Sequence, residues 1–263
     1  MNFQTVTTVS KWSPLLKHTL CTQDSDTLII ALPGQGYAHD KPLFYYLVSL
    51  AQTTGFDLFN ISYGFQASKA SFHKEELPIL VLETNQALST LDLTTYQRVI
   101  IIAKSLGTFL AQTLYEALIH LKPHLDIQQI LLTPLSASTP NYYPVPTLVI
   151  YGTSDDLLDT AARTRVHLNA TRTEAVKGAD HSLLIGQITD DLSALTDVYG
   201  FMAEFLKNPK SDLGLTAKQN LYLTAVTPED YPLLADTLIA SDALYRPLMG
   251  DAFLKLAAKY RQT

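Results

Sequence analysis

Six short aliphatic runs, separated by longer amphipathic stretches, constrain the fold of this chain more than any other feature. Near-continuous apolar strands of this kind are typical of a parallel sheet that is covered by helices on both faces. The runs therefore predict an α/β fold with a mostly parallel central sheet. They are TLIIAL from Thr27, DLFNIS from Asp57, RVIIIA from Arg98, QILLT from Gln129, TLVIY from Thr147 and TEAVKG from Thr173.

The stretches between these runs carry the spacing of amphipathic helices, which we expect to begin near residues 41, 74, 106, 157 and 190. Asp40, followed by Pro42, resembles a helix N-cap with proline in the first turn. The segment FQTVTTV, within the first twenty-five residues, predicts one or two further strands at the edge of the sheet. These elements together predict one α/β domain over residues 1–207.

A polar segment after this domain, KNPKSDLGLTAKQ, predicts a linker at residues 208–219. In the remaining residues, 220–263, NLYLTAV predicts a strand, and TPED resembles a capping box that opens a helix. Fewer than fifty residues rarely form an independent core. We therefore expect this C-terminal extension to pack on the main domain or on a second subunit, which would form a homodimer through the extension.

Composition narrows the classes of partner and the compartment. The chain has 263 residues and a formal net charge of −6, without a dense run of Lys and Arg, which argues against nucleic acid or an anionic membrane as a partner. Cys21 is the only cysteine, so an intrachain disulfide and a multi-cysteine metal site are excluded. The N-terminal MNFQTVTTVSKW has no apolar signal-peptide region, and no apolar run approaches the ~20 residues of a membrane span. We expect a cytoplasmic protein.

The stretch IIAKSLGT joins a predicted strand to a predicted helix through a serine, Ser105. The helix follows because apolar residues recur through FLAQTLYEALIHL. A sharp strand-turn-helix junction lifts its central residue clear of the sheet and requires small residues two positions before and after it. Ala103 and Gly107 meet that requirement. Ser105 is therefore a candidate nucleophile.

Two later strand ends supply the partners that a serine nucleophile needs. Asp155 lies in GTSDD after the TLVIY run, and His181 lies in GADHS after TEAVKG. Ligands in open α/β sheets bind at the carboxyl ends of strands. A serine hydroxyl needs a histidine to accept its proton, and the histidine needs a carboxylate to hold its tautomer. All three side chains are thus expected at one edge of the sheet.

The motifs AKSLG, GTSDD and GADHS, in this order, resemble those of the α/β-hydrolase superfamily, especially its small esterase-like and dienelactone-hydrolase-like members. The resemblance covers about residues 25–205. It implies an α/β-hydrolase fold with Ser105 as nucleophile, His181 as general base and acid, and Asp155 as orienting carboxylate. Asp156 is the adjacent alternative, but the acid usually lies three residues after the glycine. The implied reaction is hydrolysis of a small carboxylic ester or thioester, with no metal and no cofactor.

The resemblance also implies an oxyanion hole of two backbone N–H groups. One belongs to Leu106, directly after the nucleophile. The other lies in the loop LPGQGY, where Gln35 is the expected donor and Gly36 the alternative. Two departures from the family pattern concern the shape of this region: Ala103 replaces the first glycine of the elbow, and Pro33 replaces the usual histidine of the loop.

Loop residues after the predicted strands are expected to line an apolar substrate pocket: Tyr37, Tyr63, Leu135 and Tyr143. Around the elbow, Lys104 occupies the variable position of the motif, where we expect a solvated side chain or a contact with an anionic substrate group. Asp180 is expected to form a turn beside His181. The other histidines, His18 among them, are interpreted as surface or partly packed residues.

Two alternatives stay open from the residues alone. The first is a non-catalytic interaction protein on the same scaffold, because hydrolase folds also host such proteins. The second concerns the extension, in which NLYLTAVTPEDYPLLADTLI is similar to the first strand and helix of GNAT acetyltransferases. No Q/R-x-x-G-x-G/A loop for acetyl-CoA follows, so acetyltransferase activity is not expected.

Overall fold

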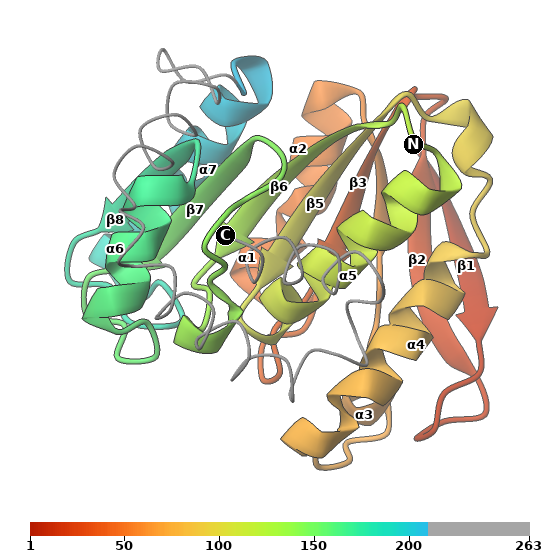
Figure 1. Ribbon diagram of the computed structural model, residues 1–263, viewed down its shortest axis with the longest axis horizontal. Helices are drawn as coiled ribbons and strands as arrows, with labels where there is room; N and C mark the ends of the chain where they lie inside the picture. Colours follow the sequence, from red (N-terminus) through yellow and green to blue (C-terminus); the bar gives the residue numbers. More distant parts are fainter. Residues whose placement is uncertain (210–263) are drawn as a thin grey trace, which may run out of the picture. The chain divides into compact units, whose positions relative to one another are not determined.

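A computed structural model describes residues 1–209 of the chain, and its centre is one eight-stranded sheet. The strand order is β1-β2-β4-β3-β5-β6-β7-β8 (Figure 1). β2 pairs antiparallel with β1 and with β4, whereas all other neighbours are parallel. The mostly parallel sheet predicted from the aliphatic runs is therefore confirmed. The strands are β1 Asn2–Thr8, β2 Leu16–Thr22, β3 Thr27–Leu32, β4 Asp57–Asn60, β5 Arg98–Lys104, β6 Asp126–Leu132, β7 Thr147–Gly152 and β8 Arg172–Val176.

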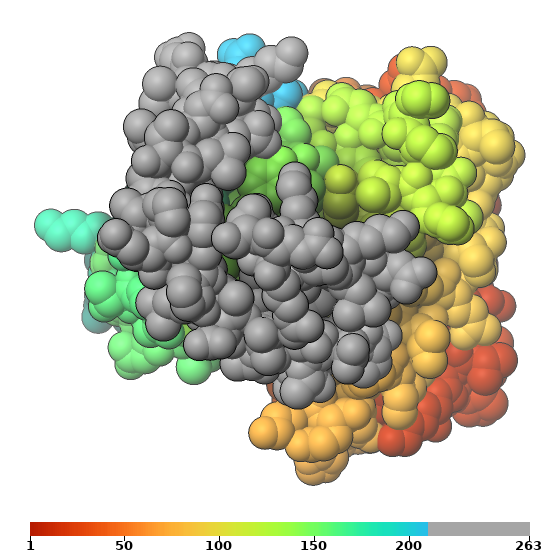
Figure 2. All heavy atoms as spheres, in the orientation of Figure 1, coloured from red at the N-terminus to blue at the C-terminus, as the bar shows by residue number. Residues whose placement is uncertain are grey.

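Helices cover both faces of the sheet. In Figure 1, α1, α2 and α7 lie behind the strands, and α4, α5 and α6 lie in front. Side chains of α4 and α5 meet on the front face, as Figure 2 shows at its right. The helices are α1 Pro42–Tyr45, α2 Leu47–Thr54, α3 Gly64–Ala67, α4 Leu77–Leu88, α5 Leu106–Leu121, α6 Thr160–Asn169 and α7 Ile188–Lys207, with 3₁₀ turns at Lys74–Glu76, Leu93–Thr95 and Ser136–Ser138.

The expected cap of α1 is wrong by one residue. Lys41, rather than Asp40, is the N-cap, and its carbonyl accepts the N–H groups of Phe44 and Tyr45. Lys41 precedes Pro42, and a residue before proline is driven out of the helical region into an extended conformation. Its φ of −84° and ψ of 151° fit that restriction. The helix must therefore begin at Pro42, with the extended residue as its cap.

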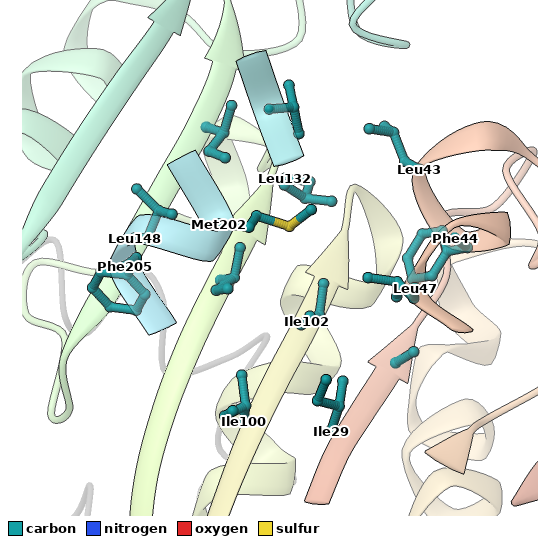
Figure 3. Packing of buried hydrophobic residues seen from close by; sticks show 14 of the residues in the cluster. Ile29, Leu43, Phe44, Leu47, Ile100, Ile102, Leu132, Leu148, Met202 and Phe205 are labelled. Atoms are coloured by element: carbon teal, nitrogen blue, oxygen red, sulfur yellow. The ribbon is translucent and has the colours of Figure 1, made fainter. Parts of the chain in front are cut away.

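The largest core cluster lies between the sheet and the helices behind it. Alternate residues of each strand contribute, as the two-residue period of a strand requires. Figure 3 shows Ile100 and Ile102 of β5 beside Ile29 of β3, facing Phe44 of α1 and Met202 of α7. All of these side chains are buried. This packing joins strands from both halves of the sheet, and the loops of the site follow the carboxyl ends of these strands.

Within residues 1–209, no helix combines the length and the apolar character needed to cross a bilayer. α7 ends at Lys207, and the domain boundary predicted after that residue stays a prediction. The predicted linker from residue 210 onward lies outside the described residues, and so does the extension with its GNAT-like segment and its expected role in dimerisation, and these stay predictions.

Candidate active site

Ser105 lies at a strained turn between β5 and α5. Its φ of 49° and ψ of −113° are rare for a residue with a side chain, and such strain is frequent at functional sites. A Cβ at Gly107 would lie 2.3 Å from the carbonyl oxygen of Leu32, so α5 can approach β3 this closely only with glycine there. Ala103, which stands in place of the usual first glycine, is completely buried. The expected elbow geometry is therefore present.

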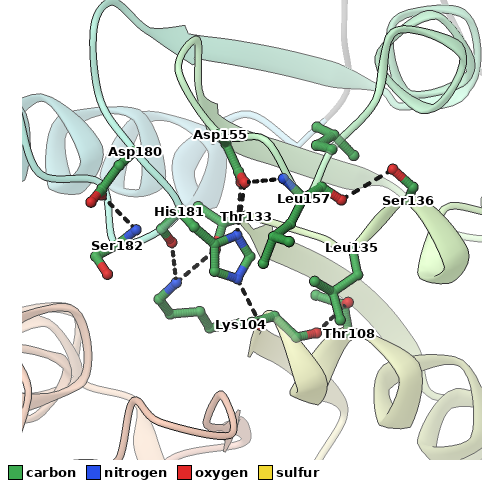
Figure 4. A network of polar contacts seen from close by, with 12 residues as sticks. Lys104, Thr108, Thr133, Leu135, Ser136, Asp155, Leu157, Asp180, His181 and Ser182 are labelled. Atoms are coloured by element: carbon green, nitrogen blue, oxygen red, sulfur yellow. Dashed lines mark hydrogen bonds and ion pairs between the residues drawn. The ribbon is translucent and has the colours of Figure 1, made fainter.

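Three side chains from three strand ends form one hydrogen-bonded chain. Ser105 Oγ lies 2.8 Å from His181 Nε2. His181 Nδ1 lies 3.0 Å and 2.9 Å from the two carboxylate oxygens of Asp155, and Figure 4 shows the imidazole ring beside Asp155. An ionised carboxylate only accepts hydrogen bonds, so Asp155 selects the tautomer with the proton on Nδ1. That tautomer leaves Nε2 free to accept the proton of Ser105.

Asp155 is completely buried, whereas Asp156 is exposed. Besides His181, the backbone N–H of Leu157 donates to Asp155 Oδ1 at 3.0 Å. Arg163 donates to the backbone carbonyl of Asp155 at 2.7 Å, which holds the turn itself. A buried carboxylate is tolerated when hydrogen bonds replace its lost water. The structure thus brings Asp155, and not Asp156, to the histidine.

The turns that carry Asp155 and His181 are packed backbone against backbone. A Cβ at Gly152 would lie 2.1 Å from the carbonyl oxygen of Ala179, a distance that no side chain can occupy. The N–H of Ser154 donates to the same carbonyl at 2.9 Å. Asp180 accepts from the N–H groups of Ser182 and Leu184, which confirms it as a turn-forming residue (Figure 4). The acid and the histidine are therefore fixed by main-chain contacts.

The loop expected to supply the second oxyanion donor lies beside Ser105, because a Cβ on Gly34 would be 3.3 Å from Ser105 Cβ. Gln66 of α3 donates to the carbonyls of Gly34 at 2.7 Å and of Gln35 at 2.9 Å. In a planar trans peptide the N–H points opposite to the carbonyl. The N–H groups of Gln35 and Gly36 consequently point away from Gln66. Sequence reasoning missed Gln66, since a glutamine in a short helix carries no motif.

The other expected donor, the Leu106 N–H, belongs to the first residue of α5. The first N–H groups of a helix have no acceptor within that helix, and the helix dipole makes this end attractive to negative charge. The Leu106 N–H is therefore suited to an anion that forms beside Ser105.

The four expected pocket residues fall into two groups. Tyr37 and Leu135 are partly buried, at the carboxyl edge of the strands. Tyr63 and Tyr143 are only 1% and 2% exposed, and Tyr63 stacks on Phe65. Their hydroxyls lack a hydrogen-bond partner among the described residues. Tyr63 and Tyr143 therefore lie in the interior, and a pocket role for them would require an enclosed cavity.

Lys104 is buried, with 1% of its surface exposed, so the expectation of a solvated side chain is wrong. Its Nζ donates to Thr133 Oγ1 at 2.6 Å and to the backbone carbonyl of His181 at 2.7 Å (Figure 4). Burial lowers the pKa of Lys104 to about 8, against the opposing influence of Asp155 and Asp180. Lys104 follows Ile102 by two residues on the same face of β5, and it is buried because both faces of this strand are covered.

His18 is also interior, contrary to the expected surface or partly packed position. Its Nε2 lies 2.8 Å from Thr8 Oγ1, and its Nδ1 accepts the N–H of Ser62 at 3.1 Å. Burial, with a smaller contribution from nearby His39, lowers the pKa of His18 to about 4. His18 thus ties the antiparallel end of the sheet together as a neutral imidazole and does not contact the triad.

A hollow with a volume of about 270 Å³ lies between β8 and α7, lined by Val176, Asp197 and Phe201 among others, and none of the three triad residues lines it. It is therefore separate from the site around Ser105. Within residues 1–209, no three His, Cys, Asp or Glu side chains are grouped closely enough to hold a metal ion.

Comparison with known proteins agrees with this geometry at the level of the fold. No protein-family model and no curated protein matches the chain. Among solved structures, a hydrolase from Agrobacterium vitis, described as putative, has 13% identity and a TM-score of 0.55, covering 76% of this chain and 98% of its own. A dienelactone hydrolase from Anabaena variabilis has 16% identity and a TM-score of 0.55, covering 78% of this chain and 97% of its own.

A third similar structure is the mouse α/β-hydrolase domain-containing protein 10, with 11% identity and a TM-score of 0.52, covering 77% of this chain and 99% of its own. Identities this low indicate shared architecture rather than shared chemistry. With the strand order, the antiparallel β2 and the serine at the β5–α5 turn, these neighbours show that the chain has the α/β-hydrolase fold.

Proposed function

We propose that the protein is a serine hydrolase that cleaves a carboxylic ester or thioester through an acyl-enzyme on Ser105. The observation that carries the proposal is the continuous hydrogen-bonded chain from Ser105 through His181 to buried Asp155. Similarity in fold to proteins described as hydrolases supports the same reading. The substrate is expected to be a small molecule.

In the first half of the reaction, Ser105 Oγ attacks the carbonyl carbon while its proton passes to His181 Nε2. Asp155 stabilises the resulting imidazolium through the Nδ1–H. The negative charge on the former carbonyl oxygen is stabilised by the Leu106 N–H and by the N–H of Gln35, with Gly36 as the alternative donor. Collapse of this intermediate breaks the bond to the alcohol or thiol, which leaves with the proton from His181.

The second half of the reaction returns the enzyme to its starting state. A water molecule gives a proton to His181 Nε2 as its oxygen attacks the acyl carbon. The bond to Ser105 then breaks, the serine recovers its proton from His181, and the carboxylic acid is released. One histidine serves both halves because it alternates between base and acid.

The test is fluorophosphonate labelling of the purified full-length protein, with turnover of p-nitrophenyl esters from acetate to decanoate measured in parallel. We expect the wild type to label, and Ser105→Ala and His181→Ala to lose labelling and turnover. Losing a triad member typically lowers kcat by about 10⁴-fold or more. The chain-length profile of the esters would then define the acyl pocket.

Two matched variants control for indirect effects. Ser154→Ala removes an exposed serine in the acid turn, and His167→Ala removes a histidine that contacts Tyr151 rather than Ser105. Both are expected to retain activity. A folded wild-type protein that neither labels nor hydrolyses any ester would refute the proposal and favour the non-catalytic alternative.

A further inference from the structure

The side chain of Lys104 connects three loops that the catalytic reaction must keep in register. Lys104 directly precedes Ser105 in the chain. Its Nζ donates to Thr133, the first residue after β6, and to the carbonyl oxygen of His181 itself. Nζ also lies over the ring of Tyr37, 4.8 Å from the ring centroid. Tyr37 belongs to the loop after β3, which approaches Ser105. One ammonium group thus touches the turns that follow β3, β6 and β8.

The burial of the Lys104 ammonium is not explained by contact with solvent or by a gain in stability of the fold. A buried lysine disfavours folding unless its charge is compensated, and both of its hydrogen-bond acceptors here are neutral oxygens. Thr133 itself has a φ of 42°, an uncommon conformation for a β-branched residue, and it is fully buried. Costly features of this kind persist where the surrounding structure requires them, and they concentrate at functional sites.

A role for Lys104 as the general base does not fit the geometry. His181 Nε2 already accepts from Ser105 Oγ at 2.8 Å. Lys104 Nζ contacts Thr133, the His181 carbonyl and the Tyr37 ring rather than the serine hydroxyl. Whatever Lys104 contributes to the reaction is therefore exerted through the residues that it holds.

We propose that Lys104 is a positioning residue whose ammonium group fixes the His181 turn and the Tyr37 loop relative to Ser105. The proposal rests on the proposed function. The contact with the His181 carbonyl holds the backbone of the base, while the Asp155 carboxylate holds its ring. A misplacement of about 1 Å in such an arrangement can cost about 100-fold in rate.

The charge on Lys104 strengthens these contacts. A charged donor forms a hydrogen bond roughly twice as strong as a neutral one, and only the cation is attracted to the face of Tyr37. The titratable residues near the ammonium are Asp155, Asp180 and Tyr37. His181 contacts it only through its backbone carbonyl. Since burial lowers the pKa of Lys104 to about 8, the contacts are expected to weaken as the pH rises through that value.

The first experiment compares Lys104→Met with Lys122→Met in the full-length protein. Lys122 is the matched control, because its Nζ also donates to backbone carbonyls, those of Leu93, Thr94 and Tyr96, but at the opposite end of α5. With p-nitrophenyl acetate as substrate, we expect Lys104→Met to lower kcat about 100-fold with KM changed by less than about threefold. Lys122→Met is expected to keep the wild-type kcat.

The second set of measurements uses the same variants and separates positioning from simple loss of stability. The kcat of the wild type is expected to decline several-fold as the pH rises through about 8, while Lys104→Met shows no such decline. The NMR signal of the hydrogen-bonded His181 Nδ1–H provides a readout that does not depend on turnover. It should weaken in Lys104→Met and be retained in Lys122→Met.

Failure of the positioning role can be distinguished from failure of the proposed function. If the wild type is inactive, the function fails, and the His181 signal alone decides the role of Lys104. If the wild type is active and Lys104→Met matches it in kcat, pH profile and His181 signal, the positioning role is overturned. Equal losses in the Lys104 and Lys122 variants would also overturn it, because they would report general destabilisation.

Discussion

The amino edge and the carboxyl edge of the parallel strands contain similar polar contacts, but these contacts hold different groups in place. At the amino edge, Lys122 donates to a row of backbone carbonyls, and Arg98 donates to Gln128 Oε1 at 2.6 Å and to the Leu206 carbonyl at 3.2 Å. At the carboxyl edge, Lys104 also donates to a backbone carbonyl, but it does so while buried, and the carbonyl belongs to His181.

The difference lies in what surrounds the contact. Main-chain turns at the carboxyl edge approach so closely that glycine is required at Gly107 and Gly152, and the backbone is strained at Ser105 and Thr133. The contacts at the amino edge join helix and strand ends without such strain in the same residues. The amino edge also has a buried carboxylate, Asp57, and a positive φ at Asp24, so the close main-chain packing at Gly107 and Gly152 is what distinguishes the edge that carries the site.

The largest effect that would sharpen this comparison is expected from Asp155→Asn. The amide can donate to His181 Nδ1 and so favour the wrong tautomer, which in a serine-protease triad costs about 10⁴-fold in kcat. Asp156→Asn, one residue along and exposed, is expected to leave kcat unchanged. Steady-state kinetics on one ester decides between them, and equal effects at both positions would contradict the assignment.

Gly152→Ala tests the close packing of the carboxyl edge. The new methyl would lie 2.1 Å from the Ala179 carbonyl oxygen, so the acid and histidine turns must separate. We expect a loss of about 3 kcal/mol in the free energy of unfolding, together with lower activity. At Gly36 nothing lies within 4 Å of an added Cβ, so Gly36→Ala should cost little in urea denaturation. Unchanged stability of Gly152→Ala would contradict the close main-chain packing described for the carboxyl edge.

The pH dependence of stability tests the buried charge. Burial lowers the pKa of Lys104 to about 8 from its ordinary value of 10.5, so between these values the unfolded chain binds a proton that the folded chain does not. Stability due to this residue therefore rises with pH across that window, by at most about 1.4 kcal/mol per pH unit. Urea midpoints for wild type minus Lys104→Met should show this rise, and Lys122→Met should not alter it.

The smallest effect is expected at the amino edge. Arg98→Met leaves the buried Gln128 side chain without its arginine donor, and we expect a loss of about 1–2 kcal/mol in the free energy of unfolding. Fluorophosphonate labelling rates should stay at the wild-type level in the folded variant. A large loss of labelling would show that the two edges are not functionally distinct.

The fold was largely predictable because its central strands, β3–β7, are rich in apolar residues and almost entirely buried. The runs from Thr27 to Thr173 correspond to β3–β8, and the polar junctions between them mark the turns. The position of Lys104 does not follow from its residue type, because β5 is buried on both faces up to its last residue. Ile100 and Ile102 alternate into the core behind β5, and the next residue in that series is Lys104.

The parts of the site that depend on distant segments were not predictable in the same way. Gln66 reaches the oxyanion loop from α3, and the interior positions of Tyr63 and Tyr143 follow from packing between elements. The order of Ser105, Asp155 and His181 along the chain was visible because each follows its own strand. Which donors and aromatic rings surround them is decided by tertiary contacts, which a single sequence does not display.

The hydrogen bond between Ser105 and His181 joins residues 76 positions apart, and Asp155 lies 26 positions before the histidine. Contacts of such separation carry a loop-closure cost and form only when the intervening strands are in place. A nascent chain that has paired β3, β5 and β6 still lacks the turns after β7 and β8. If the protein hydrolyses esters as proposed, recovery of that activity during refolding would mark the docking of these last two strands.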